Sequence, residues 1–278
     1  MTATGLIVAL GSHRYRVERP FFIPTTGTVT DVSVTEEGHI HVLVRRDPLV
    51  DQPGSSIFSL SPEGDVLAEF GSEVADAHML AAAPNGSLHV VDRDAHEVIE
   101  FRDGLRVGGL GTRNGPQEPF NHPTGIAVAP DGSLYVCEGY AGHSVWRFGT
   151  DGSILARWGA HGSGPGEFVN AHALWVRPDG SVVVVDREND RLQVFDPDGV
   201  LLHIWGGFVK PLDIWGDPEG RVYVSDFAPS LTLLDFDGIR LGQCRPVLNA
   251  AHGLCGAADG TIYFAEPSPS RISRIVPL

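Results

Sequence analysis

Short apolar runs alternate with tight turns along the whole chain. The clearest copy is residues 168–195, FVNAHALWVRPDGSVVVVDRENDRLQVF, in which Pro178-Asp179-Gly180 separates two apolar runs. Glycine accepts the positive φ that such turns require, so each pair of runs is predicted to form a β-hairpin. No stretch of ten or more residues shows the 3.6-residue period of an amphipathic helix. The pattern therefore predicts an all-β protein.

The hairpins recur as six copies of one unit. The copies align without a gap on six turn glycines, which are Gly38, Gly86, Gly132, Gly180, Gly220 and Gly260. Six positions after the glycine, Val44 stands in the first copy and an acid in the other five: Asp92, Glu138, Asp186, Asp226 and Glu266. We expect these acids to be structural and to bond backbone N–H groups between units.

A second turn, usually Asp-Gly, follows in most copies, so each unit is predicted to hold four antiparallel strands. The spacing of the units is 40 to 48 residues, which is typical of β-propeller blades. We therefore predict a single domain, residues 1–278, that forms a six-bladed β-propeller. The sixth unit lacks a second Asp-Gly turn, and the N-terminal run Leu6–Leu10 is predicted to close the last blade as its outer strand.

One position of the repeat varies in a regular way. Eight residues before each aligned glycine, at the head of the innermost strand, stand Thr30, His78, Thr124, His172, Leu212 and His252. Alternate blades of a sixfold ring are related by about 120°, so the three histidines are predicted to converge on the ring axis. Three imidazoles with an open fourth position are typical of catalytic zinc sites. Imidazole also accepts other divalent transition metals, so zinc is a preference.

The loop after the second strand of each unit is predicted to emerge beside the histidines, because the glycine turns lie at the opposite end of the hairpins. This places Arg45, Arg46, Arg93, Tyr140 and Arg187 on the rim of the predicted metal site. Arginines around a metal indicate a small anionic substrate, such as a carboxylate. Each arginine could instead pair with a neighbouring acid. Tyr140 is the rim residue that could donate or accept a proton.

The charge and the cysteine content of the chain limit the partners and the cellular location that can be expected. The formal net charge of −15 argues against nucleic acid, which is bound through concentrated Lys and Arg. No apolar run is long enough to span a membrane, and the first residues do not resemble a signal peptide. Three cysteines (Cys137, Cys244 and Cys255) form no disulfide framework, which favours a cytoplasmic location. The oligomeric state is left open.

Several motifs resemble those of a known family. Residues 123–128 (PTGIAV), 138–140 (EGY), 171–174 (AHAL) and 186–189 (DREN) resemble the PTDVAV, DGY, PHSL and DREN motifs of peptidyl-α-hydroxyglycine α-amidating lyases. These enzymes are NHL-repeat propellers. The fold-level resemblance covers all six units, and the specific resemblance covers about 70 residues plus the two other histidines.

The resemblance implies roles for individual residues. It implies zinc bound by His78, His172 and His252, a catalytic Tyr140 and an active-site Arg187. A further arginine of the family's first blade falls at Arg46 or at Arg45, and Arg93 is expected to contribute to substrate binding. The family's structural calcium is not carried over, because Gly253 stands where the family has an aspartate. Ala250 and Ala141 replace a methionine and a cysteine of the family, and we expect a smaller substrate than a secreted peptide.

These observations lead to one main hypothesis and two alternatives. The main hypothesis is a zinc-dependent lyase that cleaves the N–C bond of an α-hydroxyglycine-like carbinolamide, releasing an amide and glyoxylate, or acts on a related small α-hydroxy acid. The first alternative is a non-catalytic NHL propeller that serves as a protein-interaction module. The second is a calcium-dependent lactonase, which is disfavoured because calcium prefers oxygen ligands and the inner register supplies imidazoles.

Overall fold

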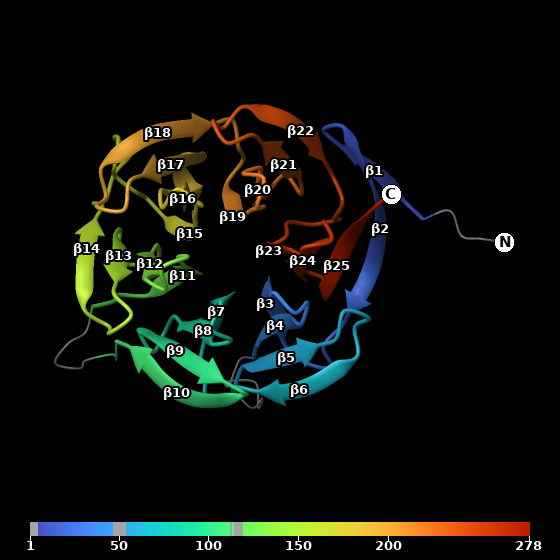
Figure 1. Ribbon diagram of the computed structural model, residues 1–278, viewed down its shortest axis with the longest axis horizontal. Helices are drawn as coiled ribbons and strands as arrows, with labels where there is room; N and C mark the ends of the chain where they lie inside the picture. Colours follow the sequence, from blue (N-terminus) through green and yellow to red (C-terminus); the bar gives the residue numbers. More distant parts are fainter. Residues whose placement is uncertain (1–4, 47–53, 112, 114–118) are drawn as a thin grey trace.

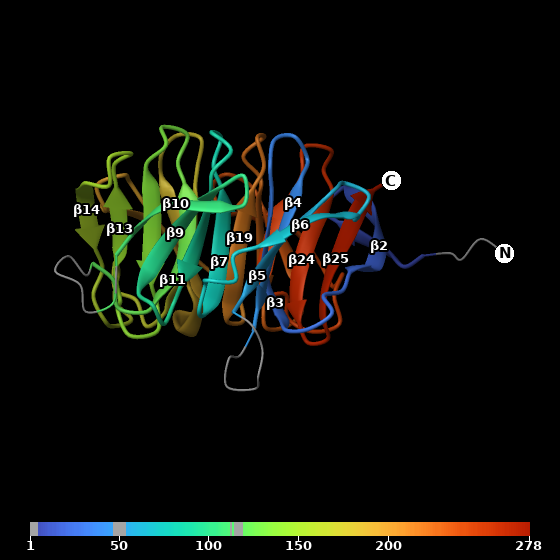
Figure 2. The ribbon, with the colours of Figure 1, turned by 90° about the horizontal axis from the view of Figure 1, so that it is seen from below.

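The chain folds into a closed ring of six β-sheets around a central axis (Figure 1). The computed structural model describes residues 5–46, 54–111, 113 and 119–278. Within these residues, five sheets have four antiparallel strands and the sixth has five. This confirms the predicted six-bladed β-propeller. Seen from the side, the strands of each blade run between the two faces of the disc (Figure 2).

The first two strands of every blade form the hairpin nearest the axis. The innermost strands are β3 (Thr28–Val34), β7 (Ala77–Ala82), β11 (Pro123–Val128), β15 (Ala171–Val176), β19 (Pro211–Gly216) and β23 (Gly253–Gly256). The second strands are β4 (Ile40–Arg45), β8 (Leu88–Asp92), β12 (Leu134–Glu138), β16 (Val182–Asp186), β20 (Val222–Asp226) and β24 (Ile262–Pro267). All six turn glycines between these strands have a positive φ of 81° to 86°, as the hairpin prediction requires.

The third and fourth strands complete each blade toward the outside. The third strands are β5 (Ser56–Leu60), β9 (Glu97–Arg102), β13 (Val145–Phe148), β17 (Arg191–Phe195), β21 (Leu231–Leu234) and β25 (Ser270–Pro277). The outer strands of blades one to five are β6 (Val66–Phe70), β10 (Leu105–Leu110), β14 (Ile154–Trp158), β18 (Leu201–Gly206) and β22 (Arg240–Cys244). A short 3-10 helix, η2 (Arg187–Asn189), follows β16.

The N-terminal segment closes the ring, but the strand that does so differs from the prediction. β2 (His13–Phe22) pairs with β25 and supplies the fourth strand of blade six. The predicted run lies in β1 (Ile7–Leu10), which turns back at Gly11 and pairs with β2 as a fifth, outermost strand. β2 is the longer of the two strands, so it covers more of the open edge of β25.

The core lies between neighbouring blades. One apolar cluster, for example, joins Val183 and Val185 of blade four with Val222 and Val224 of blade five. Because each sheet buries apolar residues against the next sheet, the ring is held together by packing around its whole circumference. Among the residues described, no helix is both long and apolar enough to cross a membrane.

The repeated acids fix the segments that connect the blades. Asp92 accepts hydrogen bonds from the backbone N–H groups of Ala75 (2.7 Å) and Asp76 (3.1 Å), in the segment that enters its own blade. Asp186 accepts one from Val169 at 3.2 Å in the same way. Asp226 and Glu266 differ, since their partners lie in the loop or strand that follows within the same blade. The predicted bonds to backbone N–H groups of the connecting segments are therefore confirmed for Asp92 and Asp186, whereas the prediction is wrong for Asp226 and Glu266, whose cited partners lie within their own blade.

Candidate metal centre

A β-bulge at the head of the innermost strands turns the variable position of the repeat toward the axis. In β15 the pairing with β16 skips from Ala171 to Ala173, so His172 lies outside the ladder. β3, β7, β11 and β19 show a register shift at the corresponding place. A bulge inserts an unpaired residue and re-aims its side chain. The repeat therefore delivers one side chain per bulged strand to the centre of the ring.

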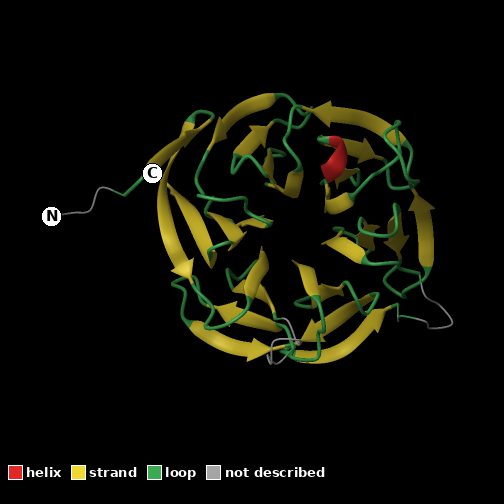
Figure 3. Cartoon of the chain, turned by 180° about the vertical axis from the view of Figure 1, so that it is seen from behind, coloured by secondary structure: helices red, strands yellow, loops and turns green. Residues whose placement is uncertain are grey.

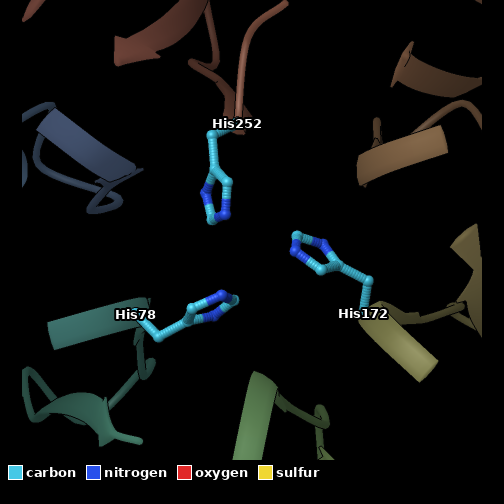
Figure 4. A group of neighbouring side chains, drawn as sticks. All are labelled: His78, His172 and His252. Carbon is cyan, nitrogen blue, oxygen red and sulfur yellow. The ribbon is translucent and has the colours of Figure 1, made fainter. Parts of the chain in front are cut away.

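The three histidines meet at the axis, as the register predicts (Figure 4). Their ring centroids are 5.2 Å apart for His78 and His172, and 4.9 Å apart for each of the two pairs that include His252. One ligand nitrogen from each ring lies within 4.8 Å of the others. No other group of three potential metal ligands meets this criterion in the described part of the chain.

Each imidazole is oriented by the blade that follows it. Nδ1 of His78 lies 2.6 Å from the carbonyl oxygen of Thr124, Nδ1 of His172 lies 2.7 Å from that of Leu212, and Nδ1 of His252 lies 2.8 Å from that of Thr30. A carbonyl oxygen only accepts hydrogen bonds, so each Nδ1 carries the proton. The unprotonated Nε2 atoms consequently face the axis. Such outer-shell bonds fix the tautomer of metal-binding histidines.

Burial keeps the three imidazoles neutral. It lowers the pKa of His252 to about 4 and the pKa values of His78 and His172 well below their usual range. The neighbouring imidazoles and the rim arginines add to this effect. A neutral imidazole is the form that binds metal, so the site needs no deprotonation near pH 7.

The donor set fits a divalent transition metal. Nε2 of His172 is buried and has no hydrogen-bond partner within the protein, although a buried polar atom normally has one. Three neutral nitrogen donors suit zinc and its neighbours in the transition series better than calcium. The orphaned nitrogen and the convergent triad together indicate a position for one such ion.

Tyr140 lies directly beside the triad. Its hydroxyl is 3.1 Å from Nε2 of His78, and because that nitrogen is unprotonated the hydroxyl donates this hydrogen bond. The guanidinium carbons of Arg93 and Arg187 lie 5.3 and 5.5 Å from the centroid of the tyrosine ring. The side chain remains 40% exposed, so it can reach both the triad and the solvent above it. The predicted tyrosine and two of the predicted arginines are thus brought together.

Two rim arginines share one buried acid. Asp76 forms ion pairs with Arg45 and, at 2.6 Å, with Arg93, and Arg93 also pairs with Asp94 at 3.1 Å. Burial raises the pKa of Asp76 to about 6, while the two arginines act in the opposite direction. Two cations face two carboxylates here, so this part of the rim carries no surplus positive charge. The sequence analysis missed Asp76, whose only signal is its place two residues before His78.

Arg187 has a different charge environment. It begins η2, which lies beside the inner strands of blade four (Figure 3), and it pairs with Glu188 at 3.1 Å. Lys210 pairs with the same carboxylate at 2.8 Å. Arg187 and Lys210 therefore share the carboxylate of Glu188, and a second carboxylate, that of Asp190, accepts the backbone N–H of Lys210 at 2.7 Å.

Arg46 is not brought to the site. Its side chain is 6% exposed and bonds to Thr26, to Ser56 and to Glu69, whose strand β6 is the outer strand of blade one. Side chains of successive strand residues point to opposite sides, so Arg46 points outward where Arg45 faces the rim. Arg45 is close enough for its charge to lower the pKa values of His78 and His252. Arg45 is therefore the first-blade arginine of this site.

Comparisons with known proteins agree with the repeat. A sequence model of the family described as NHL repeat matches residues 120–148. The chain is 27% identical over 288 residues to a probable peptidyl-alpha-hydroxyglycine alpha-amidating lyase of Caenorhabditis elegans, in a match that covers 90% of this chain and 82% of that protein. It is 27% identical over 235 residues to peptidyl-glycine alpha-amidating monooxygenase A of Xenopus laevis, covering 72% of this chain and 24% of that longer protein.

A solved structure described as streptogramin B lyase has the same fold. It superposes with a TM-score of 0.70 and covers 98% of this chain and 100% of the other, at 13% sequence identity. At this identity the likeness concerns the fold alone. Taken with the sequence matches, these findings show a six-bladed β-propeller in which one segment matches the NHL repeat and which is homologous, at 27% identity, to the peptidyl-α-hydroxyglycine α-amidating lyases.

Proposed function

We propose that this protein is a zinc-dependent lyase that cleaves the N–C bond of an α-hydroxyglycine-like carbinolamide, or of a related small α-hydroxy acid. The observation that carries the proposal is the convergence of three neutral imidazoles, two buried and one half-buried, whose Nδ1 atoms are all bound to backbone carbonyls. The names of the homologues support a lyase. A zinc ion held by His78, His172 and His252 would supply Lewis-acid polarisation of the substrate hydroxyl.

Tyr140 is suited to move the proton of the substrate hydroxyl. Its own hydroxyl already lies at hydrogen-bond distance from the ligand face of His78, where the substrate hydroxyl must come. The guanidinium carbons of Arg93 and Arg187 lie 5.3 and 5.5 Å from the centroid of its ring, so two cations lie next to the phenol. We assign Tyr140 as the general base, a role that contributes about 10²–10⁴-fold to rate in enzymes.

The bond changes balance without a further reactant. After the hydroxyl of Tyr140 has released its own proton to solvent, the resulting phenolate takes the proton of the substrate hydroxyl. The oxygen electrons then form the carbonyl of glyoxylate, and the C–N bond breaks with its electron pair going to nitrogen. The amide nitrogen then receives a proton, which Tyr140 can return. No water or electron acceptor enters this scheme, so the reaction is an elimination, as in a carbon–nitrogen lyase.

Arg187 is suited to hold the substrate carboxylate. Its one ion-pair partner in the described part of the chain is Glu188, which Lys210 shares, and its guanidinium carbon lies 5.5 Å from the ring centroid of Tyr140. Arg45 and Arg93 pair with Asp76 and Asp94. They are better placed to affect the pKa values of the neighbouring histidines than to bind the substrate. A guanidinium can bind a carboxylate through two parallel hydrogen bonds, which also fixes the orientation of the substrate.

The proposal is tested first at His172. The variant His172→Ala is expected to lose stoichiometric zinc, measured by elemental analysis, and to lose glyoxylate release from N-benzoyl-α-hydroxyglycine. His203→Ala is the matched control, because this histidine is exposed on the outer strand β18 and should keep both properties. Unchanged zinc content and unchanged activity in His172→Ala would refute the proposal.

A further inference from the structure

Three rim positions in different blades are structurally equivalent. The residue directly after the second strand is Arg93 in blade two, Arg187 in blade four and Phe227 in blade five. Each donates its backbone N–H to the carbonyl of the residue two positions before the inner-register residue: Arg93 to Asp76 at 3.0 Å, Arg187 to Asn170 at 2.9 Å and Phe227 to Lys210 at 3.3 Å. Phe227 therefore starts from the same place on blade five as the two arginines beside Tyr140.

The side chains at these equivalent positions have opposite chemistry. Blades two and four present guanidinium groups, whereas blade five presents a phenyl ring that is 52% exposed. Val209, whose carbonyl also accepts the N–H of Phe227 at 3.0 Å, is 54% exposed. Leu248, in the segment that leads to His252, is a further exposed apolar residue on this face. The equivalent rim position thus carries an arginine in blades two and four and an exposed phenyl ring in blade five.

The arginines of blades two and four and the phenyl ring of blade five can be compared with the groups that one carbon atom of the proposed substrate carries. The α-carbon of an N-acyl-α-hydroxyglycine carries a hydroxyl, a carboxylate, an acylated nitrogen and a hydrogen. With the hydroxyl directed to the triad and the carboxylate to Arg187, the acylated nitrogen must point to another sector of the rim. Blade five offers an exposed apolar side chain at the position that carries an arginine in blades two and four, and apolar surface favours an apolar occupant.

We propose that Phe227, with Val209 beside it, binds the apolar acyl group of the substrate, so that the preferred substrates are N-acyl-α-hydroxyglycines with an extended apolar acyl chain. This inference rests on the proposed function, because it assumes that the carboxylate lies on the arginine side. It assigns Phe227 a role in specificity and none in the chemical step.

The test compares two substrates that differ only in the acyl chain. Glyoxylate release is measured with N-acetyl- and N-octanoyl-α-hydroxyglycine for wild type, Phe227→Ala and Phe227→Leu. The wild type is expected to prefer the octanoyl substrate, and the ratio of the two kcat/KM values should fall about tenfold in Phe227→Ala, with Phe227→Leu intermediate. Leu241→Ala, an exposed apolar residue on the outer strand of the same blade, should leave the ratio unchanged.

A binding measurement separates this inference from the proposed function. N-octanoylglycine and N-acetylglycine lack the hydroxyl and cannot be cleaved, and their affinities are measured by calorimetry on the zinc-loaded protein. Tighter binding of the octanoyl compound that Phe227→Ala abolishes supports the apolar subsite, even if no glyoxylate is released from either substrate. A wild-type protein without chain-length preference in binding, or a Phe227→Ala variant with an unchanged preference, would overturn the inference.

Discussion

The position of a single ring proton decides what each central histidine can do. Nδ1 of all three rings faces a backbone carbonyl, so the proton is held on the side away from the axis. A side-chain acceptor in that role could be lost by mutation, whereas a backbone carbonyl cannot. Substitutions at Thr30, Thr124 or Leu212 are therefore expected to leave the tautomers intact as long as the bulge persists.

At Tyr140 the function of one oxygen atom can be isolated. Tyr140→Phe removes the hydroxyl but keeps the ring between Arg93 and Arg187. Because the phenol oxygen is the proposed base, kcat is expected to fall by about 10²–10⁴-fold. Zinc content, measured by elemental analysis of the same preparation, should not change. Full activity in this variant would show that another group takes the proton.

Sequence reasoning located some residues of the site and misplaced another for an identifiable reason. The three histidines could be predicted because they occupy the same position relative to the turn glycine in three copies of the repeat, and this position can be counted along the sequence. The choice between Arg45 and Arg46 depends on which side of β4 each side chain leaves, and the repeat could not be aligned firmly in this blade. Asp76 was missed because its importance comes from two arginines of different blades, which only the folded ring brings together.

At the scale of strands, the acid at the end of β16 holds a connecting segment in place. Asp186 is fully buried, pairs with Arg191 at 2.8 Å and bonds to Asn189 and to the N–H of Val169. Asp186→Ala leaves the arginine without its partner, so the free energy of unfolding should fall by about 3–5 kcal/mol. Urea denaturation is the measurement. Asp198→Ala, at an 86% exposed side chain, serves as the control and should change stability little.

The bulges were beyond sequence reasoning, although the hairpins were not. Turn glycines and alternating apolar runs predict where β15 and β16 lie. Nothing in the run AHALWV states that the ladder skips His172, because a bulge is a property of the paired strands. The alignment of the six copies nevertheless pointed to the correct position, since the same skip recurs in five blades.

Two buried acids in the central channel predict a pH-dependent stability of the whole ring. Asp31 and Asp213 are buried below the histidines, and burial raises the pKa of Asp213 to about 7 and that of Asp31 well above its usual range. Between about pH 4 and pH 7 the folded state then holds more protons than the unfolded state, so the free energy of unfolding falls as the pH rises through this window.

The variant Asp213→Asn tests this dependence. It loses one of the two backbone hydrogen bonds that Asp213 accepts, from Ile214 and Leu254, and should be less stable than wild type at pH 5. At pH 8 the wild type buries a charged carboxylate and the difference should shrink or reverse. Thermal unfolding at the two pH values measures the effect. A difference in Tm that is the same at both values would contradict the assigned pKa.

Closure of the ring by the N-terminal segment makes a graded prediction for truncations. Removal of residues 1–9 takes away most of β1 but keeps Leu10, which is fully buried in the core, and should lower Tm modestly, because β2 still pairs with β25. Removal of residues 1–22 exposes the whole edge of β25 and should cost considerably more. A synthetic peptide of residues 11–24 added in trans should restore part of the loss. Equal Tm values for the two truncations would argue that β2 does not close the ring.

The strand that closes the ring could not be chosen from the sequence alone. Leu6–Leu10 is the more continuously apolar run, and apolar content was the only available criterion. The strand β2 contains several charged residues that alternate with Tyr15 and Val17, which are buried. A half-buried strand at the outer edge of a blade needs only one apolar face, so alternation was the better guide.

The hydrogen bonds from the three histidines to backbone carbonyls run around the whole ring, including the gap between the two chain termini. His78 bonds forward to blade three and His172 to blade five, and His252 bonds forward to blade one, across the point where the chain starts and stops. The arrangement of the three histidines therefore does not depend on the position of the chain termini within the ring. A circular permutant with joined ends and new termini in the exposed turn at residues 197–199 should rebuild the same three-nitrogen site.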